Sequence, residues 1–584
     1  MKFSRLSFYF SELEKNASRL TMTKILANLF EESSVVEIDK VVYLSLGLLA
    51  PKYSALEMAM AEKMMIRAIA QAINSDLQTV QKEYKKLGDL GETVFQIKKN
   101  TQKSDINIKE IFEKLLEIAK DAGVGSQERK INKMSELIRN VDNLSAKYLV
   151  RIPIKKLRLG FSDMTILDAL SWSKFGDKSL RKKLEAGFSV FSDIGQIAKI
   201  FKKDGIEGIE KITSNIGIPI LPAKAERLGT AEEILEKMTG ECVLEPKYDG
   251  FRVQLHFDKN RKPDNNNENE LFLFTTDDFF VRIFSRNLED MTHMFPDIAK
   301  QLKNINASSA IIDGEAIAYS PKTGRFLSFQ ETVQRKRKHD ITAKAKEIPL
   351  KVFCFDLLSL NGQSLLSLPF WQRRQELEKI LISNKNNLFI LTEQTIARNP
   401  GEFNKFFDRV VNEGLEGLMA KKSDSIYQAG ARNFNWVKFK AGMTKELSDT
   451  IDCVVMGYYK GLGKRNEFGI GAFLVGIPDK EKILTVSKIG TGLTDLQWRE
   501  MYKRIEKIKV SQKPKEYIVN KNLYPDVWCE PKLVVEVEAD TITKSPIHTA
   551  GMALRFPRLK NFREDKDINQ ATNKHELEKI QLNK

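Results

Sequence analysis

The sequence predicts a protein of three domains: an all-α N-terminal domain, a strand-rich middle domain and an all-β C-terminal domain. The chain has 584 residues, which is too long for one hydrophobic core. Apolar residues recur at helical spacing over roughly the first two hundred positions, whereas short strand-like runs dominate the rest. The stretches G-I-P-I-L-P and F-K-A-G-M-T-K-E interrupt these patterns and indicate the two boundaries.

The N-terminal region is predicted to be a series of amphipathic helices. In S-D-I-N-I-K-E-I-F-E-K-L-L-E-I-A-K-D-A-G, apolar residues repeat with the period of a helix, namely Ile108, Ile111, Phe112, Leu115 and Leu116. Ser104 or Asp105 can cap its start, and Gly123 fits its end. Basic residues recur between the apolar positions, as in Q-E-R-K-I-N-K-M and K-K-L-R-L-G. Such a face suits a phosphate backbone but is equally typical of a solvated helix.

Strands are predicted after a linker at G-I-P-I-L-P-A-K-A-E-R-L, whose two prolines break the helical pattern. The stretch F-R-V-Q-L-H-F alternates, which places Phe251, Val253, Leu255 and Phe257 on one face of a strand. Further strand candidates are S-A-I-I-D-G-E-A-I-A-Y and L-K-V-F-C-F-D-L-L-S-L. The polar insert K-N-R-K-P-D-N-N-N-E-N-E is predicted to be a hairpin loop without a chemical role.

The C-terminal region is predicted to be a small β-barrel. Short apolar runs, I-D-C-V-V-M-G-Y-Y, I-G-A-F-L-V-G-I, I-L-T-V-S-K-I and L-V-V-E-V-E-A, are separated by turn residues. An OB-fold is a candidate, and barrels of that type often hold nucleic acid.

The composition is that of a basic globular protein, with 42% apolar and 29% charged residues. The net charge of +16 favours a polyanionic partner, because neutralised phosphates release counterions, although charge alone does not separate DNA from RNA or a membrane surface.

The start of the chain lacks the apolar core of a signal peptide, and no run is long enough for a membrane span, so export is not expected. The four cysteines are far apart, which argues against a zinc site or disulfide framework and favours a reducing cytosol.

The stretch E-P-K-Y-D-G-F-R lies between two apolar runs and carries a lysine, an acid and an arginine. Taken alone, its Asp-Gly pair predicts a hairpin turn beside a solvated Lys247. The usual phosphate cradles are missing, since neither G-x-x-x-x-G-K-[ST] nor G-x-G-x-x-G occurs. Any nucleotide site must therefore use another architecture.

Two acids interrupt strand-like runs: Glu315 in I-I-D-G-E-A-I and Glu416 in E-G-L-E-G-L-M-A-K. Burying a carboxylate there is costly unless a cation or hydrogen bonds offset the cost. Both residues are reasonable ligands for Mg²⁺, which prefers oxygen ligands and keeps part of its water shell.

The stretch N-W-V-K-F-K carries the paired cations Lys438 and Lys440, which strand alternation places on one face with Trp436. Two ammonium groups on one face repel unless an anion lies between them or solvent screens them. The sequence leaves open whether this strand binds an anion or is an exposed edge strand. The planar guanidinium group of Arg432 can donate two hydrogen bonds to the same anion.

These residues suggest a lysine nucleophile, two acids for a metal and several cations for phosphates. A lysine with a pKa near 10.4 is neutral in only about one molecule in a few thousand at pH 7. Neighbouring cations such as Arg252 and Lys438, together with a bound metal, would lower that pKa and activate the amine.

On these motifs the sequence resembles the ATP-dependent DNA ligases of the covalent nucleotidyltransferase superfamily. The words K-Y-D-G-F-R, S-R-N, D-G-E, F-D-L-L-S-L-N-G, E-G-L-M-A-K, N-W-V-K-F-K and R-F-P-R-L-K-N-F-R-E-D-K match the family's motifs in order. The stretches F-S-E-L-E-K and L-R-L-G-F-S-D-M-T-I-L-D-A-L resemble the helical domain of archaeal-type and eukaryotic replicative ligases. The resemblance implies an all-α DNA-binding domain over 1–215, an α+β nucleotidyltransferase (adenylation) domain over 216–443 and an all-β OB-fold domain over 444–584.

The resemblance also implies roles for individual residues. Lys247 would take AMP from ATP and hold it through a phosphoramidate bond. Glu245 would read the adenine amino group, and Phe355 would stack on the adenine. Arg252 and Arg286 would contact the nucleotide and the 5′-phosphate of the nicked strand.

The remaining roles concern the metal and the phosphates. Glu315 would touch the ribose or the metal, and Glu416 would support the metal. Phosphates would be held by Arg432, Lys438 and Lys440. On a mobile barrel domain, Arg555 and Arg558 would contact the leaving pyrophosphate or the nucleic acid.

The implied activity is the sealing of nicks in duplex DNA during replication, repair and recombination, with ATP as the AMP donor and Mg²⁺ or another divalent cation. Nicked DNA is the expected partner, a sliding clamp is a candidate partner, and a monomer in the cytoplasm, associated with the nucleoid of a prokaryote, is expected. Use of ADP or GTP besides ATP is left open by the sequence.

Other functions are compatible with parts of this pattern. An RNA ligase or capping enzyme would share the lysine motif, but neither resembles the long helical region combined with R-F-P-R and R-E-D-K. An inactive nucleic-acid scaffold is disfavoured by the intact Lys247, Glu315, Glu416 and Lys438. An NAD-dependent ligase would carry a cysteine-bound zinc module, which the dispersed cysteines cannot supply.

Overall fold

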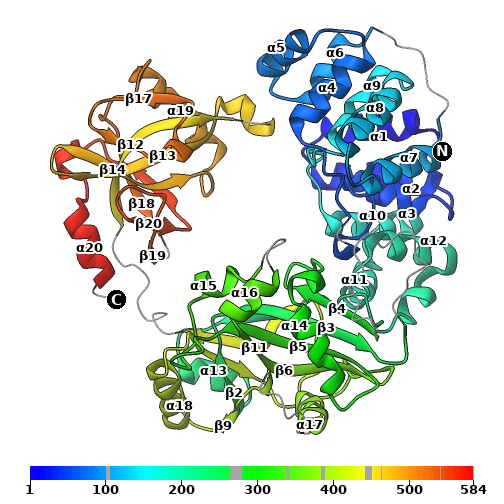
Figure 1. Ribbon diagram of the computed structural model, residues 1–584, viewed down its shortest axis with the longest axis vertical. Coiled ribbons are helices and arrows are strands. Elements are labelled where there is room, and N and C mark those ends of the chain that lie inside the picture. Colours follow the sequence, from blue (N-terminus) through cyan, green and yellow to red (C-terminus); the bar gives the residue numbers. More distant parts are fainter. Residues whose placement is uncertain are drawn as a thin grey trace. The chain divides into compact units, whose positions relative to one another are not determined.

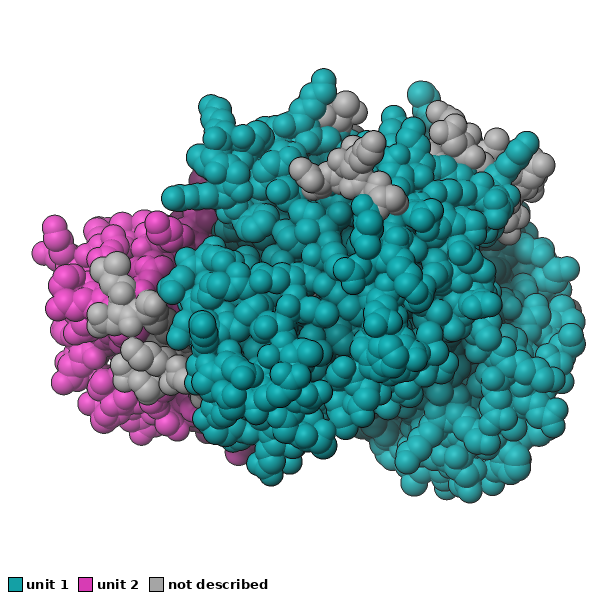
Figure 2. Space-filling view, turned by 90° about the horizontal axis from the view of Figure 1, so that it is seen from below, with its two compact units in different colours: residues 1–83, 90–441 teal, residues 84–89, 442–584 magenta. Residues whose placement is uncertain are grey.

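The computed structural model describes residues 1–54, 56–99, 106–262, 279–336, 341–382, 388–440, 450–461, 463–539 and 541–582. They form two compact units, residues 1–83 with 90–441 and residues 84–89 with 442–584 (Figure 2). Most of the polar insert predicted to be a hairpin loop lies outside the described residues. Within the described ranges, no helix has both the length and the apolar character that a membrane span requires.

The chain up to residue 210 is helical, which confirms the predicted all-α region (Figure 1). The helices are α1 (Phe3–Glu14), α2 (Arg19–Glu32), α3 (Ile38–Ser45), α4 (Glu62–Ala72), α5 (Leu77–Leu87), α6 (Leu90–Ile97), α7 (Ile108–Lys120), α8 (Ser126–Arg139), α9 (Asn143–Arg151), α10 (Asp163–Phe175), α11 (Arg181–Val190) and α12 (Ile194–Glu210).

Helix α7 carries the predicted apolar stripe, because Ile108, Ile111 and Leu115 are fully buried. Its cap is Asn107, whose side chain accepts a hydrogen bond of 2.8 Å from the Glu110 amide. The predicted caps, Ser104 and Asp105, lie outside the described residues.

Residues 211–223, here called the connector, join α12 to the first strand. The Leu221 amide donates to the Ser189 carbonyl at 2.8 Å, and the Ser192 hydroxyl donates to the Pro219 carbonyl at 2.6 Å. The predicted linker is therefore pinned to the end of α11 and the turn after it. Its last residues differ from the prediction, because they form strand β1 (Lys224–Arg227), which pairs in parallel with β11 (Arg432–Lys440).

Two sheets follow the helical region. The five-stranded sheet has the order β1-β11-β10-β2-β9, with β10 (Gly417–Lys421), β2 (Cys242–Lys247) and β9 (Thr395–Ala397). The six-stranded sheet has β4 (Phe280–Ser285), β3 (Phe251–Asp258), β5 (Ser309–Ala318), β6 (Leu350–Leu360) and β7 (Gln363–Ser364), while β8 (Phe389–Leu391) pairs with β6.

Helices and a shared core hold the two sheets together. Helices α13 (Ala231–Lys237) and α18 (Pro400–Asn412) pack on the first sheet, and α14 (Pro296–Gln301) and α17 (Phe370–Leu381) pack on the second. The shorter helices are α15 (Phe329–Val333) and α16 (Ile341–Glu347). Ile311 and Leu358 of the second sheet share a buried cluster with Trp436 of the first. The site described below lies where the sheets meet.

The turn predicted from Asp249-Gly250 is not a hairpin. Strands β2 and β3 belong to different sheets, so Tyr248 to Gly250 carry the chain from one sheet to the other. A Cβ atom on Gly250 would lie 2.2 Å from the Ala316 carbonyl oxygen, so the crossing brings two backbones too close for any side chain. The hairpin prediction was wrong because local turn chemistry does not reveal which strands pair.

Gly250→Ala is therefore expected to destabilise the larger unit by about 2–4 kcal/mol, since a backbone carbonyl cannot swing aside like a flexible side chain. Urea unfolding followed by tryptophan fluorescence measures the loss. Gly229→Ala is the matched control, because the nearest atom to its added Cβ is 3.9 Å away. Equal stabilities of the two variants would contradict the expectation.

Strand β3 confirms the predicted alternation, because Phe251, Val253, Leu255 and Phe257 are all buried in the core of the second sheet. Its polar face is buried too, which the sequence did not indicate. The connector covers this face: the Ile220 amide donates to Gln254 Oε1 at 2.8 Å, and the Gly217 amide donates to His256 Nδ1 at 3.2 Å. Burial lowers the pKa of His256 to about 3.

The smaller unit is β-rich, which confirms the predicted all-β C-terminal domain. An eight-stranded sheet contains β12 (Ile451–Lys460), β13 (Ile470–Asp479), β14 (Lys482–Ile489), β15 (Lys509–Val510), β16 (Tyr517–Ile518), β17 (Val527–Cys529), β18 (Val534–Glu538) and β21 (Arg558–Phe562). Strands β19 (Thr541–Lys544) and β20 (Met552–Arg555) form a pair, and α19 (Asp495–Lys507) and α20 (Lys574–Leu582) pack against the unit. All four cysteines are buried, and each is a free thiol.

Candidate active site

Lys247 is positioned by three neighbouring strands of the five-stranded sheet. Gly417 of β10 is opposite Lys247 of β2 on one side and opposite Lys440 of β11 on the other. A Cβ on Gly417 would lie 2.2 Å from the Phe439 carbonyl oxygen, so only glycine fits between these strands. The register therefore brings two lysines to the same end of the sheet.

Glu416 lies between these two lysines and is bonded to both. One carboxylate oxygen accepts from Lys247 Nζ and the other accepts from Lys440 Nζ. Burial acts to raise the pKa of Glu416, but the two ammonium groups outweigh it and hold that pKa below its ordinary value. The sequence suggested Glu416 as a metal ligand but gave no sign that its carboxylate pairs with the candidate nucleophile, Lys247.

Glu315 is the second acid of the site and lies on β5, opposite Arg252 of β3. Burial raises its pKa to about 7, and the charge of Glu416 adds to the rise, whereas Lys247, Arg252 and Arg286 oppose it. Two carboxylates that repel each other so close to Lys247 are a fitting donor pair for a hard divalent cation. Among the described residues no cluster of three or more potential metal ligands occurs, so water and phosphate oxygens would have to complete the shell.

Glu315→Gln is expected to stabilise the larger unit at pH 8 and to change its stability by less than about 1 kcal/mol at pH 5. The folded-state pKa of Glu315, about 7, lies above the ordinary value of 4.5, so the folded protein retains a proton that the unfolded chain releases. The wild-type protein thus loses stability as pH rises through this window, by up to about 3 kcal/mol. Urea unfolding at both pH values measures this, and an equal difference at pH 5 and pH 8 would contradict it.

Arg252 projects between the sheets and is held by a buried network. Its guanidinium donates to Asp313 and, at 3.0 Å, to the Tyr427 hydroxyl, which itself donates to Asp313 at 2.9 Å. Gln254 Nε2 donates to the other Asp313 oxygen at 3.2 Å, which ties the network to the connector. Asp313 and Gly314 lie inside β5, where the register against β6 shifts and leaves Phe355 of β6 without a partner residue in β5. Asp313 is fully buried and holds Arg252 in place, a role that the sequence did not indicate.

Glu245 lies two residues before Lys247 on β2 and is almost fully buried. Its carboxylate pairs with Lys421 Nζ at 2.7 Å and lies 3.6 Å from Arg374 Nη1. Burial raises the pKa of Glu245 against the opposing effect of these cations. Its Oε1 atom has no hydrogen-bond partner among the described residues, so an acceptor is left for an N–H group of a ligand.

Phe355 of β6 lies beside this acid. The Lys421 side chain contacts it from one side, with Nζ 4.9 Å from the ring centroid, and Trp436 packs edge-on at 6.0 Å. Lys421 and Arg374 were missed as site residues, although a lysine at the end of the apolar run G-L-M-A-K was a usable signal, because a buried ammonium needs an anion.

The remaining cations converge on Lys438. Burial lowers the pKa of Lys438, and the charges of Lys440, Arg432, Arg286 and Lys247 lower it further. The structure thus brings together the predicted phosphate-binding side chains of β11 and the turn after β4. Arg555 and Arg558 are exposed residues of the smaller unit.

Three family descriptions match the chain in order: "DNA ligase N terminus" over residues 2–171, "ATP dependent DNA ligase domain" over residues 273–440 and "ATP dependent DNA ligase C terminal region" over residues 466–566. The chain is 45% identical to a "Probable DNA ligase" of Dictyoglomus turgidum, over 99% of this chain and 97% of the relative. It is 36% identical to "DNA ligase 2" of Thermofilum pendens, over 99% of this chain and 96% of the relative. It is also 36% identical to a "DNA ligase" of Sulfurisphaera tokodaii, over 99% of this chain and 97% of the relative.

A solved structure called "Pmar-Lig_PreS3" is similar to the chain in fold. The TM-score is 0.56 at 19% sequence identity, and the match covers 96% of this chain and 99% of that chain. At this level of identity the likeness supports the architecture of helical region, paired sheets and β domain.

Proposed function

The chain belongs to the family of ATP-dependent DNA ligases, and from this premise we propose that Lys247 is the residue that carries AMP. The observation that supports this most directly is the strand register around Gly417, which gathers Lys247, Glu416 and Lys440 at one end of a sheet. A merely solvated lysine in a turn would have no reason to share a carboxylate with a second lysine.

The reaction would proceed in three displacements. The Lys247 amine attacks the α-phosphorus of ATP, an N–P bond forms, the bond to the leaving pyrophosphate breaks, and the amine's proton is lost to solvent. An oxygen of the DNA 5′-phosphate then attacks the same phosphorus and releases the lysine. The 3′-hydroxyl finally attacks the DNA 5′-phosphate, AMP leaves, and the nick is sealed. Each step depends mainly on alignment and charge neutralisation.

The described residues are suited to these tasks. Glu245 would accept a hydrogen bond from the adenine amino group through its unpartnered Oε1, and Phe355 would stack on the base. Arg252, fixed by Asp313, and Arg286 would bind the nucleotide and the 5′-phosphate.

Side chains on or next to the strands would bind the phosphates and the metal. Arg432, Lys438 and Lys440 would bind phosphate oxygens, and their mutual repulsion supports an anion between them. Glu315 and Glu416 would hold Mg²⁺, which when bound neutralises charge on the phosphates. Arg555 and Arg558 would meet pyrophosphate or DNA.

We also propose the domain limits and the setting. The DNA-binding domain would comprise residues 1–215, the adenylation domain residues 216–443 and the OB-fold domain residues 444–584. The protein would act as a monomer on nicked duplex DNA in the cytoplasm, with a sliding clamp as a candidate partner.

The test is to incubate the purified protein with ATP labelled at the α-phosphate and Mg²⁺. We expect acid-stable label on the protein that added pyrophosphate removes, and sealing when nicked duplex DNA is supplied afterwards. Absence of label under these conditions would refute the proposal. A preference for nicked RNA over nicked DNA would instead favour an RNA ligase.

A further inference from the structure

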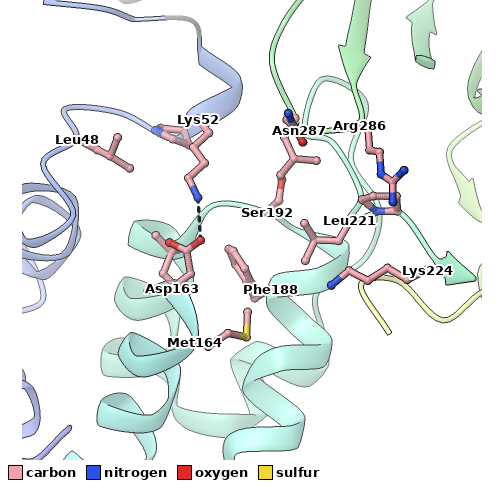
Figure 3. Close-up of a pocket in the computed structure, with 14 residues that line it drawn as sticks. Leu48, Lys52, Asp163, Met164, Phe188, Ser192, Leu221, Lys224, Arg286 and Asn287 are labelled. Carbon is pink, nitrogen blue, oxygen red and sulfur yellow. Dashed lines mark hydrogen bonds and ion pairs between the residues drawn. The ribbon is translucent and has the colours of Figure 1, made fainter. Parts of the chain in front are cut away.

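A cavity of about 340 Å³ lies between the helical part and the sheets of the larger unit (Figure 3). Its walls include Leu48, Lys52, Asp163 and Phe188 from the helical part and Lys224 and Arg286 from the sheets. This volume is at the lower end of the range for ligand pockets, so the cavity admits one small unit and no DNA duplex.

The charges of this cavity are unevenly distributed. Lys52 Nζ and Asp163 Oδ2 form an ion pair of 2.9 Å, and Figure 3 shows this pair on one side with Lys224 and Arg286 on the other. Asp163, the carboxylate in the lining, is thus already neutralised. Across the described part of the chain, no carboxylate lies within ion-pair distance of Lys224 or Arg286. The cavity therefore has a cationic side that an anion can occupy.

The strand register extends this cationic side towards Lys247. Lys224 of β1 is opposite Arg432 of β11, and like charges opposite each other in a sheet are destabilising unless an anion or solvent separates them. Arg432 and Arg286 both act on Lys438. Lys438 lies two residues before Lys440 on β11, and Lys440 is in register with Gly417 and, through it, with Lys247. Cations are therefore found from the cavity to the end of the sheet that carries the candidate nucleophile.

We propose that this cavity binds a phosphodiester of the nicked DNA strand that carries the reacting 5′-phosphate, with Lys224 as the phosphate contact. The inference rests on the proposed function, since it needs the reacting phosphate beside Lys438 and Arg286. Arg286 lines the cavity and acts on the active-site lysine, so a strand leaving the active site past Arg286 meets Lys224 next. Successive phosphates of one strand lie close enough for neighbouring cations to hold them in turn.

A phosphate bound in the cavity would also hold the helical part and the sheets of the larger unit together. Leu48, Lys52 and Phe188 line the cavity together with Lys224 of β1, so a phosphate inside it would contact both parts of the larger unit. Binding of the correct DNA end would stabilise this arrangement, and the connector, pinned at Ser189 and at Pro219, already favours it.

The first test compares Lys224→Ala with Lys405→Ala, an exposed lysine on α18 that serves as the matched control. We expect about tenfold weaker binding of nicked duplex for Lys224→Ala, and a salt dependence reduced by about 0.9 in the slope of log Kd against log salt. The amount of active protein is normalised by lysine adenylylation measured without DNA. If Lys224→Ala bound nicked DNA as tightly as Lys405→Ala does, the proposal would be overturned. Lys224 would then be a solvated lysine without a role in DNA binding.

The second test locates the phosphate. Nicked duplexes each carry one neutral methylphosphonate at successive positions on both strands, and sealing is measured with the wild-type protein and with Lys224→Ala. We expect one position near the nick, on the strand with the 5′-phosphate, where the methylphosphonate slows the wild-type protein about tenfold but adds nothing to Lys224→Ala. Independent losses at every position would overturn the proposal, and so would a raised KM for ATP without DNA, which would assign the cavity to the triphosphate. A protein that takes up no label at all would instead refute the proposed function.

Discussion

Lys247→Ala is expected to abolish transfer of AMP from ATP to the protein, because the methyl group offers no nucleophile at the end of β2. Lys440 is the nearest other amine in the register, but it lies across β10 and is bonded to Glu416. It therefore cannot simply take the place of Lys247. Lys440→Ala is the matched control, since it removes an ammonium from the same carboxylate and keeps the nucleophile.

The measurement is acid-stable label from α-labelled ATP, followed by peptide mapping. Lys440→Ala should still take up label, more slowly, whereas Lys247→Ala should take up none. A nicked duplex that already carries AMP on its 5′-phosphate needs only the final displacement, so Lys247→Ala should retain sealing of this substrate. Label on the Lys247→Ala protein would show that another residue is the nucleophile.

The sequence predicted which residues form the site better than it predicted how these residues are arranged. Strand alternation around Trp436 placed Lys438 and Lys440 correctly, because a strand with one buried face has a strict period of two. Glu315 and Glu416, which were predicted from acids that interrupt apolar runs, also lie close to Lys247. Such local periodicity is fixed by the chain itself and needs no knowledge of distant partners.

Pairing between distant segments could not be predicted in this way. Asp249-Gly250 has ordinary hairpin chemistry, yet the chain crosses between sheets there, because β10 and β5 are the partners of the flanking strands. The sequence predicts a linker at strand β1, since K-A-E-R has no apolar alternation and becomes a strand only by pairing with β11.

The buried supports of the site were missed for the same reason. Asp313 and Arg374 support Arg252 and Glu245 from other strands and helices, and no spacing in the sequence connects them. The position of Glu416 between two lysines is likewise a product of three-strand register.

That position leads to a second large effect: Glu416→Gln is expected to raise the reactivity of Lys247 towards a simple electrophile while slowing its adenylylation. In the wild-type structure the Glu416 carboxylate forms an ion pair with the Lys247 ammonium and accepts its hydrogen bond, so the amine is held and is not free to attack an electrophile. The same oxygen atoms are proposed to bind Mg²⁺, and in that arrangement they would no longer hold the lysine. Glutamine removes both the restraint on the amine and the ligand for the cation.

The two consequences are measured separately. Modification of Lys247 by trinitrobenzenesulfonate, without nucleotide or metal, should be about tenfold faster in Glu416→Gln, because the amide no longer holds the amine in an ion pair. Adenylylation with ATP and Mg²⁺ should be about a hundredfold slower, the usual cost of removing an electrostatic contact to the reacting phosphates. Glu413→Gln is the control, since Glu413 is exposed and pairs with Arg409 instead. If the rates of modification and of adenylylation both fell, the role of Glu416 would be only to keep the end of the strand in its folded conformation. Opposite changes from one substitution would identify it as the residue that holds the lysine until the metal and nucleotide arrive.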